Sequence, residues 1–150
     1  MSASPILIPF EPFHLNHYTP GLMDKVTLAD MDITALSRNW EGRAVSAILN
    51  GRVIGIAGIG KVRDGVGRGW VFLSDEARKH PIFLHRTVKR GLDLAFKELG
   101  LETIEVAVED CFETGIRWAE RLGFEYHGRK IRAEGKEFLR MTKCLSQQQL

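Results

Sequence analysis

A strand–helix–strand pattern near the C-terminus is the feature of this chain that most restricts its fold. The segment Ile104–Glu125 reads IEVAVEDCFETGIRWAERLGFE, in which a short apolar run precedes an amphipathic stretch with helical spacing. Gly123 follows that stretch, and glycine is common directly after a helix. The segment therefore predicts a buried strand over Thr103–Val108 and a helix over Glu113–Leu122, followed by another strand.

Three further strands are predicted before this segment. Ala44–Leu49 and Val53–Val62 flank the dipeptide Asn50-Gly51, which favours the tight type I′ turn of a β-hairpin. Asp64-Gly65 signals a second turn, and Gly69–Leu73 follows it as a third strand. Consecutive strands joined by such short turns are typical of an antiparallel meander.

The remaining predicted elements precede and follow this meander. Ile6–Phe13 is interrupted by prolines, which indicates an edge strand or an extended arm. Pro20–Asn39 has helical spacing, as one helix or two short ones, and His80–Leu99 is predicted to be a helix with a proline near its first position. Glu125–Arg132 and Lys136–Cys144 are predicted to form a final hairpin.

Length and element order together predict one α+β domain. A chain of 150 residues can bury one core but is short for two ordinary domains, and 44% hydrophobic with 27% charged residues is typical of a globular protein. The order β, α, βββ, α, β, α, ββ favours a mixed sheet covered by helices. We expect the domain to span residues 1–145, with residues 146–150 as a loose tail.

Charge and cysteine content narrow the class of function. A net charge of +2 does not by itself indicate nucleic-acid binding. The stretch Arg78–Arg90 is basic and forms either a solvated helix face or an anion site. Cys111 and Cys144 give no disulfide framework, and the five histidines have no metal-ligand spacing. The N-terminus lacks the pattern of a signal peptide, and no apolar run is long enough for a membrane span.

The order of elements, with the helix that ends in Arg121-Leu122-Gly123-Phe124, resembles the GCN5-related N-acetyltransferase (GNAT) fold over nearly the whole chain. The resemblance implies a mixed, mainly antiparallel sheet of about six to seven strands with helices on both faces. It also implies that the sheet splays between Gly69–Leu73 and Thr103–Val108. In GNAT enzymes, acetyl-CoA lies in that split.

Within this fold, the chain is most similar to small GNAT-like proteins of tailed bacteriophages. The shared features are Gly69-Trp70 in a strand, the basic segment Ser74–Pro81 and the helix Ile116–Phe124. Some proteins of this type are internal virion or assembly proteins, and others are acetyltransferases. The resemblance implies another phage protein or a host protein as partner, and the host cytoplasm or the virion as location.

The segment that would bind the pyrophosphate departs from the GNAT pattern. GNAT enzymes carry Gln/Arg-x-x-Gly-x-Gly/Ala after the third meander strand, whereas Ser74–Phe83 contains no glycine, and Pro81 removes an amide donor. Basic side chains are the substitutes that remain. The candidate cofactor-binding residues are therefore the basic Arg78, Lys79 and Arg86. Phe72 and Leu73, at the end of the strand that precedes them, complete the set.

The chain also has few residues that could act as the general acid or the general base of an acetyltransferase. Ala119 stands where many GNAT enzymes have the tyrosine that protonates the leaving thiolate. Glu105 and Glu109 are the candidates for a general base. For Glu105 the ordinary alternative is a solvent-facing position on a strand.

Two functions remain open at this point. The first is a GNAT-fold phage-type protein with a degenerate acyl-CoA site, acting as a virion-associated or assembly component. The second is an active acetyl-CoA-dependent N-acetyltransferase on a protein or small-molecule amine. Nucleic-acid binding is less favoured, because exposed aromatics do not alternate with the basic residues.

Overall fold

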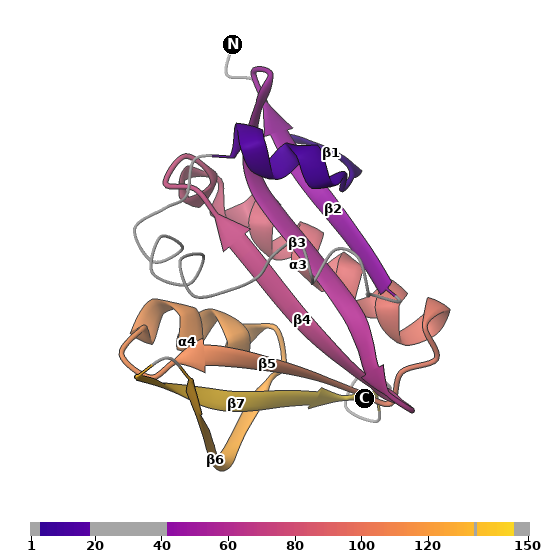
Figure 1. The fold of residues 1–150 in the computed structure, drawn as a ribbon, viewed down its shortest axis with the longest axis vertical. Helices are drawn as coiled ribbons and strands as arrows, with labels where there is room; N and C mark the ends of the chain where they lie inside the picture. The colour runs from indigo at the N-terminus through magenta and orange to yellow at the C-terminus, as the bar shows by residue number, and fades with distance from the viewer. Residues whose placement is uncertain (1–3, 19–41, 134, 146–150) are drawn as a thin grey trace.

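The computed structural model describes residues 4–18, 42–133 and 135–145. The helix predicted over Pro20–Asn39 and the tail over 146–150 lie outside the described residues. The described strands form one seven-stranded sheet in the order β1-β2-β3-β4-β5-β7-β6 (Figure 1). Their bounds are β1 Ile6–Pro9, β2 Gly42–Leu49, β3 Arg52–Arg63, β4 Val66–Leu73, β5 Thr103–Glu109, β6 Glu125–Ala133 and β7 Lys136–Cys144.

All neighbouring strands of the sheet are antiparallel except β4 and β5, which run parallel. This mixed, mainly antiparallel α+β sheet confirms the fold class predicted from the sequence. The edge strand β1 pairs with β2 only, as expected for a strand that contains a proline. The first hairpin turn is also confirmed, since Asn50 and Gly51 both have positive φ, at 51° and 76°.

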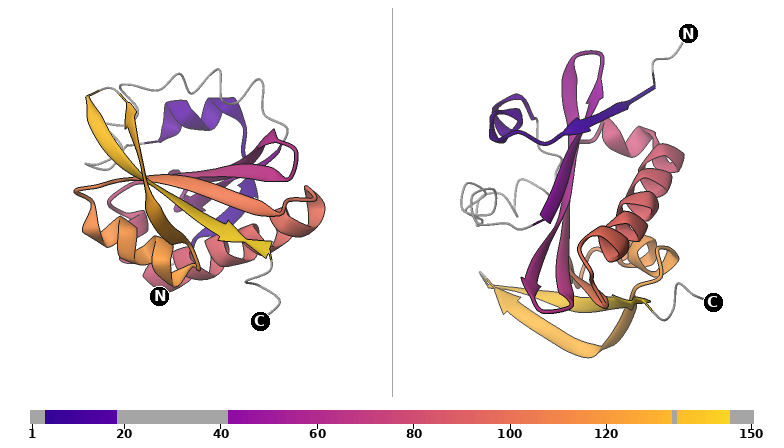
Figure 2. Two further views of the ribbon diagram at one scale, coloured as in Figure 1. Left: turned by 90° about the horizontal axis from the view of Figure 1, so that it is seen from below. Right: turned by 90° about the vertical axis from the view of Figure 1, so that its right-hand side faces the viewer.

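Two α-helices of the described residues cover one face of the sheet (Figure 2). They are α3 over Pro81–Glu98 and α4 over Glu113–Arg121. The short 3-10 helix η1 over Pro12–His17 lies on the opposite face, and η2 over Ala77–Lys79 leads into α3. Pro81 is the first residue of α3, where its missing N–H costs nothing.

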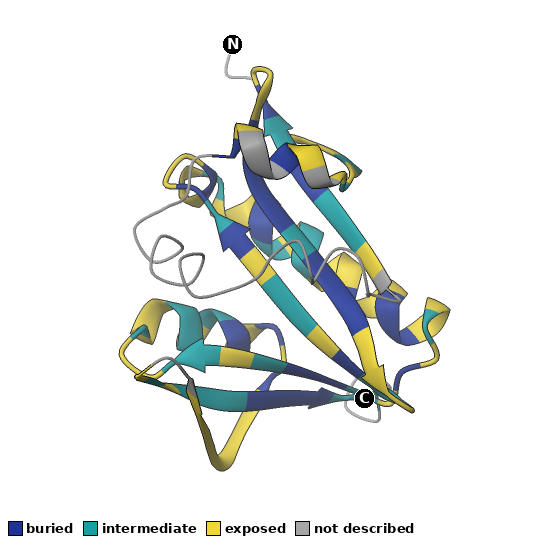
Figure 3. Ribbon diagram, in the orientation of Figure 1, coloured by how far each residue is buried: buried dark blue, intermediate teal, exposed yellow. Residues whose placement is uncertain are grey.

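Apolar side chains fill both sides of the sheet, and β3 is buried along much of its length (Figure 3). The main core lies between the sheet and the two helices, around Ile104, Met141, Leu92 and Phe96. A second core on the helix side, which includes Leu49, Ile54 and Leu84, joins β2 and β3 to α3. On the η1 side, a smaller core is formed by Tyr18, Val53, Ile56 and Phe72.

Strands β4 and β5 pair over only three residues, which are Val66 with Thr103, Gly67 with Ile104, and Arg68 with Glu105. Beyond Arg68 the two strands diverge, while β5 stays paired with β7 along its whole length (Figure 1). The predicted splay of the sheet is therefore confirmed, and its closed end lies at Arg68 and Glu105.

Strand β4 begins three residues earlier than predicted, at Val66 instead of Gly69. Glycines lower the strand signal here. Gly67 nevertheless fits this strand because the side chain of Leu101 occupies the space that a Cβ would need. A Cβ added at Gly67 would lie 2.6 Å from Cδ1 of Leu101.

Candidate functional site

The open edge of β4 presents its side chains to two different faces. Phe72 is buried on the η1 face, where its ring centroid lies 5.3 Å from that of Trp70. Leu73 lies on the helix face and packs with Phe83 and Leu84 of α3. The two strand residues predicted to bind a cofactor therefore do not face the same space.

The backbone amides of the loop after β4 donate hydrogen bonds to acceptors within the same loop. The N–H of Ala77 donates to Oγ of Ser74 at 3.2 Å, and the N–H of Arg78 donates to the carbonyl of Ser74 at 3.4 Å. Lys79 and His80 donate to the carbonyls of Glu76 and Ala77. Four consecutive amides, from residue 77 to residue 80, are thus bonded within the loop.

The start of α3 leaves two amides without a partner among the described residues. His80 stands at the N-cap and makes no side-chain capping bond, and Pro81 has no N–H. The amides of Ile82 and Phe83 follow, before Leu84 donates to the carbonyl of His80. A helix start can bind an anion through such amides.

The basic residues of the loop and of α3 lie on the surface. The guanidinium of Arg78 lies over the ring of Phe112, 5.4 Å from its centroid, and so links the loop after β4 to the start of α4. Lys79 pairs with Glu76 at 3.1 Å. Arg86 is exposed on α3 and makes no ion pair within the described part of the chain.

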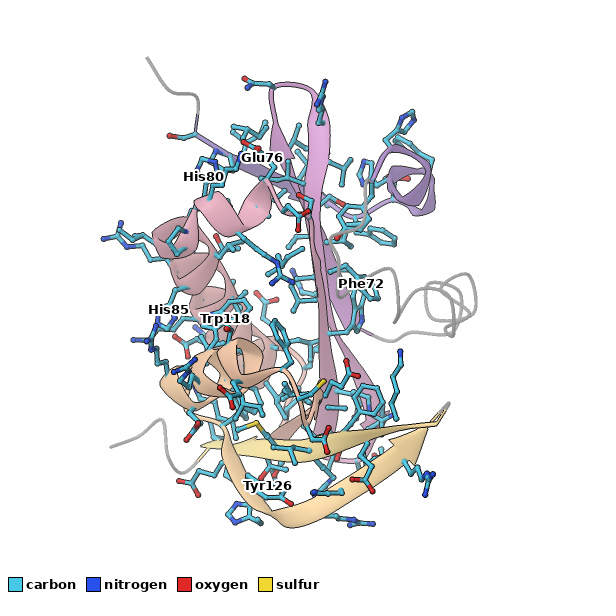
Figure 4. The ribbon with its side chains drawn as sticks, turned by 90° about the vertical axis from the view of Figure 1, so that its left-hand side faces the viewer. Phe72, Glu76, His80, His85, Trp118 and Tyr126 are labelled. Atoms are coloured by element: carbon cyan, nitrogen blue, oxygen red, sulfur yellow. The ribbon has the colours of Figure 1, made fainter. Side chains whose placement is uncertain are left out.

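Trp118 and Ala119 of α4 are packing residues. Trp118 packs against both helix-side cores, including Leu73 and Phe83. Figure 4 places Trp118 on the helix side of the sheet and Phe72 on the opposite side. Ala119 is buried in the main core. The position that holds a tyrosine in many GNAT enzymes is therefore closed here by apolar side chains.

Glu105 is the centre of an arginine cluster at the closed end of the split. Arg68 donates from Nε at 3.2 Å and from Nη2 at 2.8 Å to Oε1 of Glu105. Arg140 donates from Nε at 3.1 Å and from Nη2 at 2.8 Å to Oε2. Arg63 adds a longer contact from Nη2 to Oε2 at 3.4 Å. We call these four residues the arginine cluster.

The expected solvent-facing position of Glu105 is wrong, because its side chain is only 4% exposed. Burial acts to raise the pKa of Glu105, but the hydrogen bonds and positive charges of Arg68 and Arg140 outweigh it, and the pKa lies below its ordinary value of 4.5. Both carboxylate oxygens are also occupied. This geometry suits a residue that positions arginines better than it suits a general base.

Glu109 ends β5 and is half-buried, on the same face as Glu105 by strand alternation. It lies beyond the last residue of β5 that pairs with β4, at the open part of the split. Its role as a base stays a prediction. Within the described ranges, no three His, Cys, Asp or Glu residues are grouped in a way that would hold a metal ion.

Local sequence patterns do not indicate Arg63, Arg140 or Phe112 as site residues. Arg63 and Arg140 meet Glu105 only because the end of β3 pairs with the start of β4, at Arg63 and Val66, and β7 pairs with β5. Phe112 lies over Gly115 of α4, where an added Cβ would lie 2.4 Å from the ring. No helix in the described part of the chain has the length and apolar character needed to cross a membrane.

Comparison with known proteins supports the fold and leaves the activity open. No protein-family model matches the chain, and no curated protein matches it in sequence. Solved structures do match. A suggested phosphinothricin N-acetyltransferase superposes with a TM-score of 0.75 at 13% identity, over 95% of this chain and 99% of that one.

Two further solved structures also match. Spermidine/spermine N-acetyltransferase SpeG from Vibrio cholerae gives a TM-score of 0.68 at 16% identity, over 97% of this chain and 95% of that one. AAC(6')-Ib, solved with ribostamycin and coenzyme A, gives 0.62 at 18% identity, over 77% and 70%. At these identities the likeness shows the fold alone, and this chain has the GNAT fold.

Proposed function

We propose that this protein uses the GNAT fold for binding, with an acyl-CoA site that is degenerate. The observation that carries the proposal is the loop after β4, whose amides from residue 77 to residue 80 already bond within the loop. A pyrophosphate that used these amides would displace four hydrogen bonds, each worth about 1 kcal/mol net. The glycines that let a backbone wrap a phosphate are missing.

The basic side chains nearby replace those amides only in part. Arg78 would have to leave the ring of Phe112, at a cost of about 0.5–1 kcal/mol for an exposed cation–π contact. Lys79 is already paired with Glu76. Trp118 and Ala119 also support a degenerate acyl-CoA site, because they place apolar side chains on the helix side of the split.

Calorimetric titration with acetyl-CoA tests this proposal. We expect no saturable binding in the micromolar range. Micromolar binding that disappears when Arg78 and Lys79 are both replaced by alanine would contradict a degenerate site. Arg129→Ala is the matched control, because Arg129 is an exposed arginine on β6, which β5 and β7 separate from β4 and the loop that follows it.

For the biological role, the resemblance to small GNAT-like phage proteins supports a virion-associated or assembly component. Its partner is then another phage protein or a host protein, and its location the host cytoplasm or the virion. Mass spectrometry of purified phage particles tests retention in the virion. Particles that lack the chain, from infections that express it, would exclude the virion-associated role.

An active N-acetyltransferase is the second candidate, favoured by the open split and by the amides of Ile82 and Phe83, which have no partner among the described residues. These amides, with Arg78, Lys79 and Arg86, would hold the phosphates. The amine nitrogen would attack the thioester carbonyl, the C–S bond would break, and CoA would leave as the thiolate, protonated by solvent. Glu109 would take the proton of the amine.

Release of CoA from acetyl-CoA, measured over a broad panel of amines and with host lysate, tests the second candidate. If it holds, Glu109→Gln lowers kcat by about a hundredfold or more. Glu113→Gln is the control, because Glu113 is exposed at the start of α4 and on no strand of the split. The absence of CoA release with every amine would exclude this candidate.

A further inference from the structure

The arginine cluster carries more positive charge than its one carboxylate can balance. Three guanidinium groups surround Glu105, which leaves a surplus of two positive charges. Among the described residues, Glu105 is the only acid that Arg63, Arg68 and Arg140 contact as an ion pair. A network that served only to neutralise Glu105 would need one arginine.

Of the three arginines in the cluster, Arg63 makes the weakest contact with Glu105. Arg68 occupies Oε1 with two hydrogen bonds, and Arg140 occupies Oε2 with two more. Arg63 reaches Oε2 with a single contact at 3.4 Å, and its side chain is 57% exposed. Its charge therefore adds little to the stability of Glu105 and is directed mainly at solvent.

Donor groups of the cluster remain available to a ligand. Each guanidinium has five N–H donors in a planar fork. Arg68 uses only Nε and Nη2 on Glu105, and its side chain is 56% exposed. The Nη1–Nη2 edge of Arg68, which Glu105 does not use, offers a second pair of N–H donors, and such a pair fits the two oxygens of another carboxylate.

The location of the cluster also suits a ligand. Arg68 and Glu105 form the last pair that joins β4 and β5, so the cluster stands where the sheet opens. Arg68 lies on the face that carries Trp70 and Phe72, opposite α3 and α4. A molecule can approach it there without disturbing the main core.

We propose that Arg63 and Arg68, with Arg140 beside them, bind a carboxylate group at the closed end of the split. Glu105 is the positioning residue, since it fixes the guanidinium planes of Arg68 and Arg140. The carboxylate belongs either to a small molecule or to an acidic side chain of a protein, and the recognition chemistry is the same. The site does not depend on acyl-CoA binding and stands or falls separately from it.

Arginine side-chain NMR signals, followed during titration with succinate at low salt, test the proposal. We expect saturable shifts of the Nε–Hε signals of Arg63 and Arg68. Arg63→Gln should weaken succinate binding about tenfold, the equivalent of one charge pair worth about 1.4 kcal/mol. It should leave the thermal midpoint unchanged, because Arg68 and Arg140 still hold Glu105. Arg52→Gln, on the same strand, should change neither quantity.

Two further probes define the ligand. A blocked peptide with a single glutamate should bind as succinate does if the source is a protein side chain, and much more weakly if the site is shaped for a small molecule. Inorganic phosphate, which arginine can also bind through two hydrogen bonds, is the competing anion, and a carboxylate site should bind it less tightly than succinate. No saturable shift with succinate, tighter binding of phosphate, or equal affinity in Arg63→Gln would overturn the carboxylate site.

Discussion

Arg68 and Glu105 are opposite each other in the last paired position of β4 and β5, and Arg68 donates two hydrogen bonds to Oε1 of Glu105. The ion pair therefore ties the two strands together at the point where they begin to diverge. Arg140 binds the other oxygen from β7. One buried carboxylate thus links three neighbouring strands, and the split begins directly beside it.

Glu105→Gln should lower the free energy of unfolding by about 2 kcal/mol, because a neutral amide cannot accept charge-assisted bonds on both sides. Water offsets part of the loss, since Arg63 and Arg68 are more than half exposed. Urea denaturation at neutral pH measures the change. Glu137→Gln, which removes the exposed pair with Lys130, is the control and should cost less than about 0.5 kcal/mol. Equal small effects would contradict the linking role.

The pH dependence of stability should also report on Glu105. Burial opposes ionisation, but Arg68 and Arg140 outweigh it, so the pKa in the folded state is below the ordinary 4.5. The contribution of Glu105 is therefore complete above about pH 4.5 and is lost as the pH falls through the lower, folded-state pKa. The stability difference between the protein and Glu105→Gln should shrink below pH 4.5. A difference that stays constant on acidification would argue against this.

His14 and Ser46 should fasten η1 to the sheet. Nδ1 of the buried His14 accepts the N–H of Glu11 at 3.0 Å and lies 2.8 Å from Oγ of Ser46. Because Nδ1 accepts these bonds, the ring carries its proton on Nε2. His14→Ala should cost about 2–3 kcal/mol and speed proteolysis near Phe13, and Ser46→Ala about 1 kcal/mol. The exposed His127→Ala is the control and should be nearly neutral. A neutral His14→Ala would show that η1 is not held by this contact.

Local signals were sufficient for most of the fold. The Asn50-Gly51 turn, the proline at the start of α3 and the glycine after α4 depend on residues close together in the chain, and each is where the sequence predicts it. The splay between β4 and β5 followed from the resemblance to the GNAT fold.

The site could not be predicted to the same degree. Alternation correctly separates Glu105 from its apolar neighbours, but the residues that cover it come from 42 and 35 positions away, on β3 and β7. The contact between Arg78 and Phe112 likewise joins loops that follow two different strands. Such contacts depend on strand order and on side-chain reach, which local patterns do not contain.

Two glycines should respond in opposite ways to alanine. Gly123 has a φ of +100°, and an added Cβ would lie 3.2 Å from Cε of Lys143. Burial lowers the pKa of Lys143, whose Nζ donates to the carbonyl of Leu122 at 2.7 Å, so this side chain has little freedom to move. Gly123→Ala should therefore destabilise the protein by about 1–2 kcal/mol.

Gly91 is the matched control for Gly123, because it lies within α3 with nothing within 4 Å of an added Cβ. Gly91→Ala should stabilise the protein by about 0.5–1 kcal/mol, since alanine favours the helix. Thermal and urea denaturation of both variants measures the two effects. If Gly123→Ala were as stable as Gly91→Ala, neither the positive φ of Gly123 nor the nearby side chain of Lys143 would disfavour a Cβ at this position.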